Sequence, residues 1–440
     1  MTHGLVRIAA HIAASALLLV PQTRAGGESI SVDEWPQFRG PDGEGHAPQH
    51  GLPREWSDTK NVAWKVPIPG KGWSSPVIRD GKLWVTTATE RNSSLRVLCL
   101  DCKTGEQIWN VQAFFKGEPG KINPKNSHAT PTIVLGESKL YAHFGAHGTA
   151  CLSSEGRVLW KAQTNYYHHH GPAGSPVVVG DLLIYSCDGF DRPFYDRLER
   201  PDVDHDQFVV ALDTDSGAVR WKSPRKGRHS YSTPLTIDVD GKSQVISAGG
   251  DRVVAYDPAS GKEIWSCRYN GYSVVPRPVY AGGLVFICTG FDEPSLLAIR
   301  PDGQGDVSET HVAWTLHESV PLTASPLAVG DELYIITDGG IASCLDVKSG
   351  RRYWRNRLPG KYSASPLYAD GRIYFQTEAG VTHVIAPGKS FRKLATNRVK
   401  GETLASMAAY DRSFFIRTDR MLYRITEKTE EQPVNESAGP

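Results

Sequence analysis

A run of three histidines is the feature of the sequence best suited to chemistry. His168, His169 and His170 follow one another, and a neutral imidazole is a good ligand for zinc or copper. Successive side chains of an extended segment point to opposite sides, so the three imidazoles cannot all reach one ligand. Three interpretations stay open: a polar loop with one or two hydrogen-bonded histidines, a metal site, or a site for a small molecule or peptide.

An acidic segment over about residues 188–207 is the second candidate. It is rich in carboxylates, whose hard oxygen atoms suit Ca²⁺, although a solvated insertion has the same composition. We predict that this segment and the histidine run meet at the mouth of a central channel and share a ligand, with two further histidines beside them. The predicted ligand-binding residues are His128, His168, His169, His170, Asp188, Asp191, His205 and His229.

Several catalytic and binding motifs are missing from the sequence. It contains no G-x-S-x-G, P-loop, H-E-x-x-H or EF-hand motif, so we assign no catalytic residue and favour a protein that is not an enzyme. Its 49 basic and 48 acidic residues nearly balance, and nucleic-acid binding usually needs a basic face. The sequence therefore favours a protein or small-molecule ligand at the funnel face, and no nucleic acid.

The elements that must position these residues are repeated along the chain. A tryptophan recurs at intervals of about 40 to 60 residues, a spacing typical of β-propeller blades. Its seven copies are Trp64, Trp109, Trp160, Trp221, Trp265, Trp314 and Trp354. A small residue or arginine followed by proline recurs between them, at Ser75, Thr130, Ser175, Thr233, Arg277, Ser325 and Ser365. Each unit reads as four short strands with glycine turns, as over residues 325–329, 332–337, 341–346 and 351–355.

The two ends of the chain set the number of units. Seven units run from Ser75 to about Val399, and an eighth has only three strands, at about residues 404–410, 413–418 and 421–425. The segment 61–65 carries Trp64 without three companion strands, so the chain ends complete one another and leave no open sheet edge. We therefore predict an all-β fold with almost no helix, an eight-bladed β-propeller of four-stranded antiparallel blades in which an N-terminal strand completes the last blade.

The turn before each tryptophan has a specific pattern. Residues 211–221 read A-L-D-T-D-S-G-A-V-R-W, and the turn glycine, which supplies a positive φ, recurs in four units as Gly105, Gly217, Gly261 and Gly350. This pattern resembles the tryptophan-docking repeat of the PQQ-like eight-bladed propellers, a family that includes quinoprotein alcohol dehydrogenases and BamB-type outer-membrane assembly factors. Residues 35–41, W-P-Q-F-R-G-P, resemble the start of exported members. The resemblance covers about residues 35–426.

Some features depart from that family. Ser153 and Arg300 replace the aspartate of the second and fifth units, and Phe391 lies near the tryptophan position of the seventh. Quinoprotein dehydrogenases typically carry adjacent cysteines over the cofactor, and this sequence has no such pair. The resemblance therefore implies an exported binding or protein-interaction scaffold without an assured cofactor. The alternative is a divergent PQQ-dependent oxidoreductase of the alcohol or sugar dehydrogenase type, which would need PQQ and Ca²⁺.

The seven cysteines are expected to be mostly small buried residues. Cys99, Cys151 and Cys344 hold the repeat position of Ala211. On an extended strand Cys99 and Cys102 would lie about 10 Å apart, beyond the roughly 7 Å that a disulfide allows. An occasional disulfide stays open in an exported protein.

The chain ends are expected to lie outside the propeller. Residues 8–20 are mostly apolar and residues 23–25 offer a small-x-small cleavage site, a pattern that indicates a secretory signal peptide; an uncleaved anchor is the alternative. We expect a signal peptide at 1–25, a lead segment at 26–60, the propeller at 61–426 and a disordered tail at 427–440. The mature chain would then be periplasmic or extracellular, without an integral membrane span.

Overall fold

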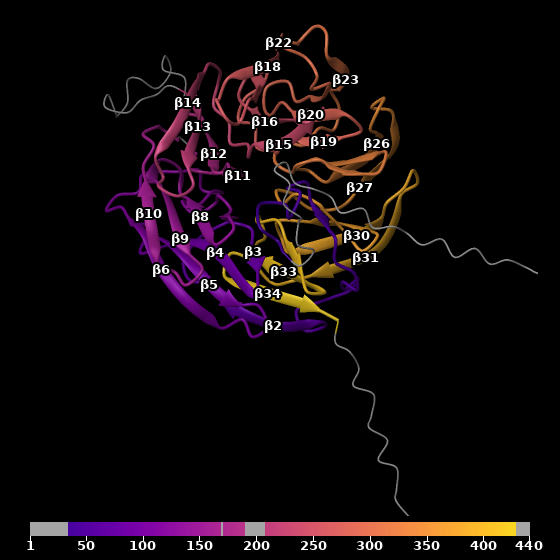
Figure 1. Ribbon diagram of the computed structural model, residues 1–440. Helices are drawn as coiled ribbons and strands as arrows, with labels where there is room; N and C mark the ends of the chain where they lie inside the picture. Colours follow the sequence, from indigo (N-terminus) through magenta and orange to yellow (C-terminus); the bar gives the residue numbers. More distant parts are fainter. Residues whose placement is uncertain (1–33, 169, 190–206, 428–440) are drawn as a thin grey trace, which may run out of the picture.

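Eight sheets surround a common axis in the part of the chain that the structure describes (Figure 1). The structure is a computed structural model, which describes residues 34–168, 170–189 and 207–427. Each sheet contains one four-stranded antiparallel blade, and a single 3₁₀ helix, η1 Gly145–His147, is found among the described residues. The predicted all-β, eight-bladed propeller is confirmed.

The blades follow one another along the chain. Blade 1 contains β3 Val77–Arg79, β4 Lys82–Thr89, β5 Ser94–Asp101 and β6 Gln107–Phe115, and blade 2 contains β7 Val134–Leu135, β8 Lys139–His143, β9 Thr149–Ser153 and β10 Val158–Ala162. Blade 3 contains β11 Val177–Val179, β12 Leu182–Cys187, β13 Gln207–Asp213 and β14 Val219–Arg225. Blade 4 contains β15 Leu235–Val239, β16 Lys242–Ala248, β17 Arg252–Tyr256 and β18 Glu263–Arg268, with β22 Gly305–Asp306 beside β18. Blade 5 contains β19 Val279–Ala281, β20 Leu284–Cys288, β21 Leu296–Ile299 and β23 Val312–Leu316, and blade 6 contains β24 Leu327–Val329, β25 Glu332–Ile336, β26 Ile341–Asp346 and β27 Arg352–Arg357. Blade 7 contains β28 Leu367–Ala369, β29 Arg372–Gln376, β30 Val381–Ala386 and β31 Arg392–Arg398, with β1 His46–Ala47 beside β28. Blade 8 contains β32 Ala408–Tyr410, β33 Ser413–Arg417, β34 Met421–Thr426 and β2 Val62–Pro67.

Local sequence explains the hairpins and the burial of each blade. The turn between β3 and β4 is Asp80-Gly81, with φ of 50° and 72°, and two residues of positive φ suit the twist of a tight hairpin. The middle strands are buried on both faces, as in β26, because each lies between two neighbouring blades. The outer strands alternate between partly buried and exposed residues, as in β2, because one side faces solvent.

The first and last parts of the chain share blade 8. Strand β2 pairs antiparallel with β34, with Trp64 opposite Arg424 and Pro67 opposite Met421, and the indigo and yellow strands lie side by side in Figure 1. This confirms the predicted closure by an N-terminal strand. Strand pairing of this kind leaves no gap between the first and last blades.

Most of the repeated tryptophans cover the glycine turn of the next blade. Trp160 in blade 2 lies on Gly217 of blade 3, where a Cβ atom would come within 2.6 Å of the indole. Its Nε1 donates to the carbonyl of Thr214 at 3.0 Å. The other docked pairs are Trp64 with Gly105, Trp109 with Gly156, Trp221 with Gly261 and Trp314 with Gly350. The contact therefore requires glycine, and in these five pairs it joins one blade to the next.

Two units depart from this docking. Trp265 is fully buried and donates through Nε1 to the side chain of Gln244 in its own blade, at 2.9 Å. In blade 7, Ala395 pairs with Val384 at the register where blade 6 has its tryptophan. Phe391, which the sequence placed near the tryptophan position, lies before that register, and its ring is 5.1 Å from that of Trp354 in the preceding blade.

The cysteines lie opposite these tryptophans or elsewhere in the core. Cys99, Cys151 and Cys344 pair across the hairpin with the tryptophans of their own blades, as Ala211 does in blade 3. A small side chain at this position leaves space for the indole beside it. All seven cysteines are free and buried.

Candidate functional site

A belt of hydroxyl groups surrounds the axis where the innermost strands begin. The backbone N–H of one blade donates to the hydroxyl of the next, at 2.9–3.1 Å, in the steps Ser75 to Thr132, Thr132 to Ser175, Ser175 to Thr233, Arg277 to Ser325, Ser325 to Ser365, and Ser365 to Ser406. The belt thus connects the backbone of one blade to a hydroxyl side chain of the next. It also gives the channel a neutral, polar wall.

The second blade contributes to the belt through a residue that the sequence pattern did not select. The recurring small-residue–proline pair of this blade is Thr130-Pro131, whereas Thr132 is the member of the belt. Thr130 instead donates its hydroxyl proton to Asn126 at 2.6 Å. Pro131 lies two residues before the position that proline holds in other blades, where this blade has Ile133.

Arg277 replaces the hydroxyl residue of blade 5. Its Nε donates to the carbonyl of Pro234 at 3.0 Å, and its Nη1 donates to the carbonyls of Phe38 and Gly43 at 2.9 and 2.8 Å. Both carbonyls bonded by Nη1 belong to the segment before the first blade. Arg277 therefore ties that segment to the inner wall.

The N-terminal segment crosses the axis. Trp35 exchanges two backbone hydrogen bonds with Ile78 of blade 1, and the carbonyl of Pro36 accepts one from Leu135 of blade 2. Strand β1 then runs parallel to β28 of blade 7, and Arg277 holds the intervening residues at blade 5. Because blades 1 and 5 are opposite each other in a ring of eight, the segment closes one end of the channel.

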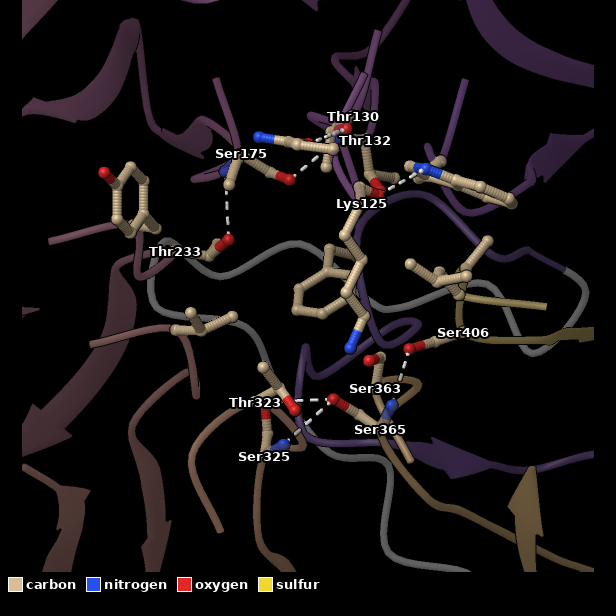
Figure 2. A pocket seen from close by; sticks show the side chains of 18 of the residues that line it. Lys125, Thr130, Thr132, Ser175, Thr233, Thr323, Ser325, Ser363, Ser365 and Ser406 are labelled. Carbon is tan, nitrogen blue, oxygen red and sulfur yellow. Dashed lines mark hydrogen bonds between the residues drawn. The ribbon is translucent and has the colours of Figure 1, made fainter. Parts of the chain in front are cut away.

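The belt and the N-terminal segment line a cavity of about 380 Å³ (Figure 2). Connections between blades add Trp73 and Tyr231 to its wall, and the loop between β20 and β21 of blade 5 adds Phe291. Lys125 points into the cavity in Figure 2, and its Nζ pairs with Glu378 at 2.6 Å.

Asp338, the carboxylate among the described lining residues, is bonded to backbone. One of its oxygens accepts hydrogen bonds from the amides of Leu322 and Thr323 at 3.1 Å. Like Lys125, it is therefore already bonded within the protein.

The histidine run contributes to two different clusters. The ring of His168 lies 5.3 Å from that of His147, which in turn lies 5.0 Å from that of His128. The ring of His170 instead lies 5.8 Å from that of His229, and His170 lines the cavity. The predicted residues His169, Asp191 and His205 lie outside the described residues.

The first histidine cluster lies partly in the interior, with His128 buried and His147 and His168 partly exposed. Burial holds the pKa of His168 well below its ordinary value and also lowers the pKa of His128. Both imidazoles are therefore neutral near pH 7. His147 was not selected from the sequence, because it is an isolated histidine between two strands.

Asp188 has a buried partner of its own. Its Oδ1 accepts a hydrogen bond from Arg225 Nε at 2.8 Å, and both side chains are 1% exposed. His168 and Asp188 line the same small cavity, so the structure brings these two predicted residues near each other. The carboxylate nevertheless serves to balance the charge of Arg225.

A second group of ligating atoms lies in the N-terminal segment, at Asp42, Glu44 and His46. His46 bonds Asp42 through Nδ1 at 2.5 Å and the carbonyl of Ala328 through Nε2 at 2.6 Å. Since both partners are acceptors, both ring nitrogens carry protons. Despite burial, the bond and charge of Asp42 raise the pKa of His46 to about 9. This group is an ion pair that holds the segment and does not suit a metal.

Comparison with known proteins gives one family. A profile of the family described as outer membrane protein assembly factor BamB matches residues 55–189, 205–306 and 304–389. The outer membrane protein assembly factor BamB of Burkholderia pseudomallei is 23% identical over 288 residues, which are 63% of this chain and 65% of that protein. The chain thus spans less than two thirds of the length of this curated relative.

Solved structures share the fold at low identity. BamB from Moraxella catarrhalis superposes with a TM-score of 0.58 and 14% identity over 84% of this chain and 98% of its own. A quinohemoprotein alcohol dehydrogenase from Pseudomonas putida HK5 gives 0.60 and 10% over 91% and 81%. A europium-containing methanol dehydrogenase gives 0.60 and 11% over 88% and 89%. Among the described residues, no helix has the length and apolar character needed to cross a membrane.

Proposed function

Because the chain belongs to the family described as outer membrane protein assembly factor BamB, we propose that it is a protein-binding scaffold that acts outside the cytoplasm in outer-membrane protein assembly. The observation that carries this proposal is that the central cavity is closed at one end. The N-terminal segment closes it at one end, and the loops between blades line it toward the other. A hollow with convergent polar groups is the default binding site of such a fold.

The lining of the cavity supports an extended polypeptide as the partner. Trp73, Tyr231 and Phe291 supply aromatic area, and aromatic residues are enriched where proteins bind one another. The hydroxyls of the belt are already engaged with backbone amides, so they form a rigid polar wall. Shape and hydrogen bonding, more than charge, would then select the ligand.

Two observations support a location on the periplasmic side of the outer membrane. The pattern at residues 8–25 indicates export. The curated relative is named an outer membrane protein assembly factor.

The described residues do not fit PQQ, the cofactor of the quinoprotein members of this fold. PQQ is a polycarboxylate, so a cavity that binds it must supply free cations, and a bound Ca²⁺ needs several carboxylate or carbonyl oxygens. The described lysine of the cavity, Lys125, is paired with Glu378. The described carboxylate, Asp338, accepts two backbone bonds. We therefore derive no redox step for this chain.

A binding titration tests the proposal. The full mature chain is titrated with a denatured outer-membrane β-barrel protein of the source organism. Phe291→Glu changes a residue of the cavity that is 40% exposed, and Val219→Glu is the control on an outer strand, 58% exposed. We expect saturable binding that weakens by about tenfold or more in Phe291→Glu only. Absence of saturable binding, equal effects of both variants, or dye-linked alcohol oxidation after addition of PQQ and Ca²⁺ would overturn the proposal.

A further inference from the structure

Three imidazoles from separate connections converge beside blade 2. His128 precedes β7, His147 ends η1 between β8 and β9, and His168 precedes β11. One ring nitrogen of each lies within 4.8 Å of the other two. His128 Nδ1 and His147 Nε2 are 3.0 Å apart. Two nitrogens bound to one tetrahedral ion at about 2.0–2.1 Å lie roughly 3.3 Å apart, so this spacing is close to that of a shared ion.

The hydrogen bonds of His128 and His168 leave suitable nitrogens for an ion. His128 Nδ1 lies 3.0 Å from His147 Nε2, so one of these two nitrogens holds the proton between them and the other accepts it. His168 accepts a hydrogen bond at Nδ1 from the amide of Ala146 at 3.1 Å, so this neutral imidazole carries its proton on Nε2 and a lone pair on Nδ1. Ion binding would exchange the Ala146 bond of His168 for a metal bond.

An ion between the rings of His128 and His147 would take the place of the proton that they share. Coordination needs a lone pair on both His128 Nδ1 and His147 Nε2, so each ring would carry its proton on its other nitrogen when the ion is bound.

The surrounding backbone leaves space for this arrangement. At Gly145, which has φ of 62°, a Cβ atom would lie 2.7 Å from His168 Nδ1. Glycine thus permits the close approach of the third ring. His128 is buried, whereas His147 and His168 are partly exposed, so an ion can enter from solvent.

We propose that His128, His147 and His168 bind one late first-row divalent ion, Zn²⁺ or Cu²⁺. Neutral imidazole nitrogens favour these ions, whereas Ca²⁺ and Mg²⁺ prefer oxygen ligands. Three protein ligands leave a coordination position for water or an incoming ligand. The proposal does not depend on the binding of a polypeptide in the central cavity.

Metal titration of the full mature chain tests this inference. Chelator-treated protein is titrated calorimetrically with Zn²⁺ alone. The variants are His147→Ala and His168→Ala, and the control is His50→Ala, whose side chain is 86% exposed. We expect one ion per wild-type chain and unchanged affinity in His50→Ala. Removal of a residue that hydrogen-bonds a metal ligand lowers metal affinity by about 10- to 100-fold. Each cluster variant removes a ligand itself, so its Zn²⁺ affinity should fall by more than this.

A second measurement covers the case in which a variant fails to fold. Cu²⁺ bound to the wild-type chain should show nitrogen hyperfine splitting from imidazole in its electron paramagnetic resonance spectrum. No stoichiometric Zn²⁺ binding, a Cu²⁺ spectrum without that splitting, or equal affinity in folded His147→Ala and the wild type would overturn the site. The three rings would then form a hydrogen-bonded network only.

Discussion

Arg277 Nη1 donates a 2.9 Å hydrogen bond to the carbonyl of Phe38, which lies 239 residues earlier in the chain. This bond joins blade 5 to the segment that closes the channel. Arg277→Ala should lower the free energy of unfolding by about 2–4 kcal/mol, because hydrogen bonds from a buried charged donor are lost. Denaturant unfolding measures this effect.

Arg277→Ser is the matched variant. It restores the hydroxyl that the belt has in other blades, and it should recover part of the stability lost in Arg277→Ala. Equal stability of Arg277→Ala and the wild type would show that the segment is held by other contacts.

Two glycines separate the effect of tryptophan docking from that of backbone conformation. Gly217 has φ of 72° beneath Trp160, whereas Gly241 has φ of 77° and nothing within 4 Å of an added Cβ. Gly241→Ala should cost about 1–2 kcal/mol of stability from the left-handed backbone alone. Gly217→Ala should cost about 1–3 kcal/mol more, because the indole must move. Equal costs in thermal unfolding would argue against docking as a link between blades.

The buried pair of Asp188 and Arg225 should be structural. Asp188→Ala leaves a buried guanidinium without its counter-charge and should cost about 3–5 kcal/mol. The double variant Asp188→Leu with Arg225→Met should regain most of that loss, because both charges are then absent. If Asp188→Ala unfolds at the same denaturant concentration as the wild type, the carboxylate is available for a ligand, as the sequence suggested.

The ion pair in the N-terminal segment should make stability depend on pH. Burial alone would lower the pKa of His46, but the hydrogen bond and the charge of Asp42 raise that pKa from 6.5 to about 9. A raised histidine pKa gives stability that is complete below about pH 6.5 and is lost as the pH rises through about 9. The wild type should therefore lose more stability than His46→Gln over this interval. Parallel pH profiles would show that His46 is not held as an imidazolium.

Repetition made the fold predictable from the sequence. Seven proline-marked units and an incomplete eighth predicted the number of blades, and the lone strand around Trp64 predicted the closure that β2 and β34 make. These features could be recognised because each blade repeats the same strand and turn pattern. Where a blade departs from the repeat, the pattern alone does not place each residue: Thr132, two residues after Thr130, belongs to the belt, and Ala395 holds the register of the repeated tryptophan in blade 7.

The site was less predictable, because its contacts join distant segments. Nothing local to Arg277 shows that it bonds Phe38, and the single His147 carries no motif, although it lies between the rings of His128 and His168. The histidine run itself was recognisable. Its division between two clusters depends on how the connections of blades 2 and 3 pack.

Photo-cross-linking in living cells of the source organism tests the central claim, that the cavity of this propeller binds a polypeptide, most directly. A photoreactive amino acid is placed at position 291, in the cavity wall, and at position 219 on an outer strand as the control. We predict cross-links to outer-membrane β-barrel precursors from position 291 and none from position 219. A folded, exported protein that gives no such cross-link from position 291, or gives the same products from both positions, would contradict the account.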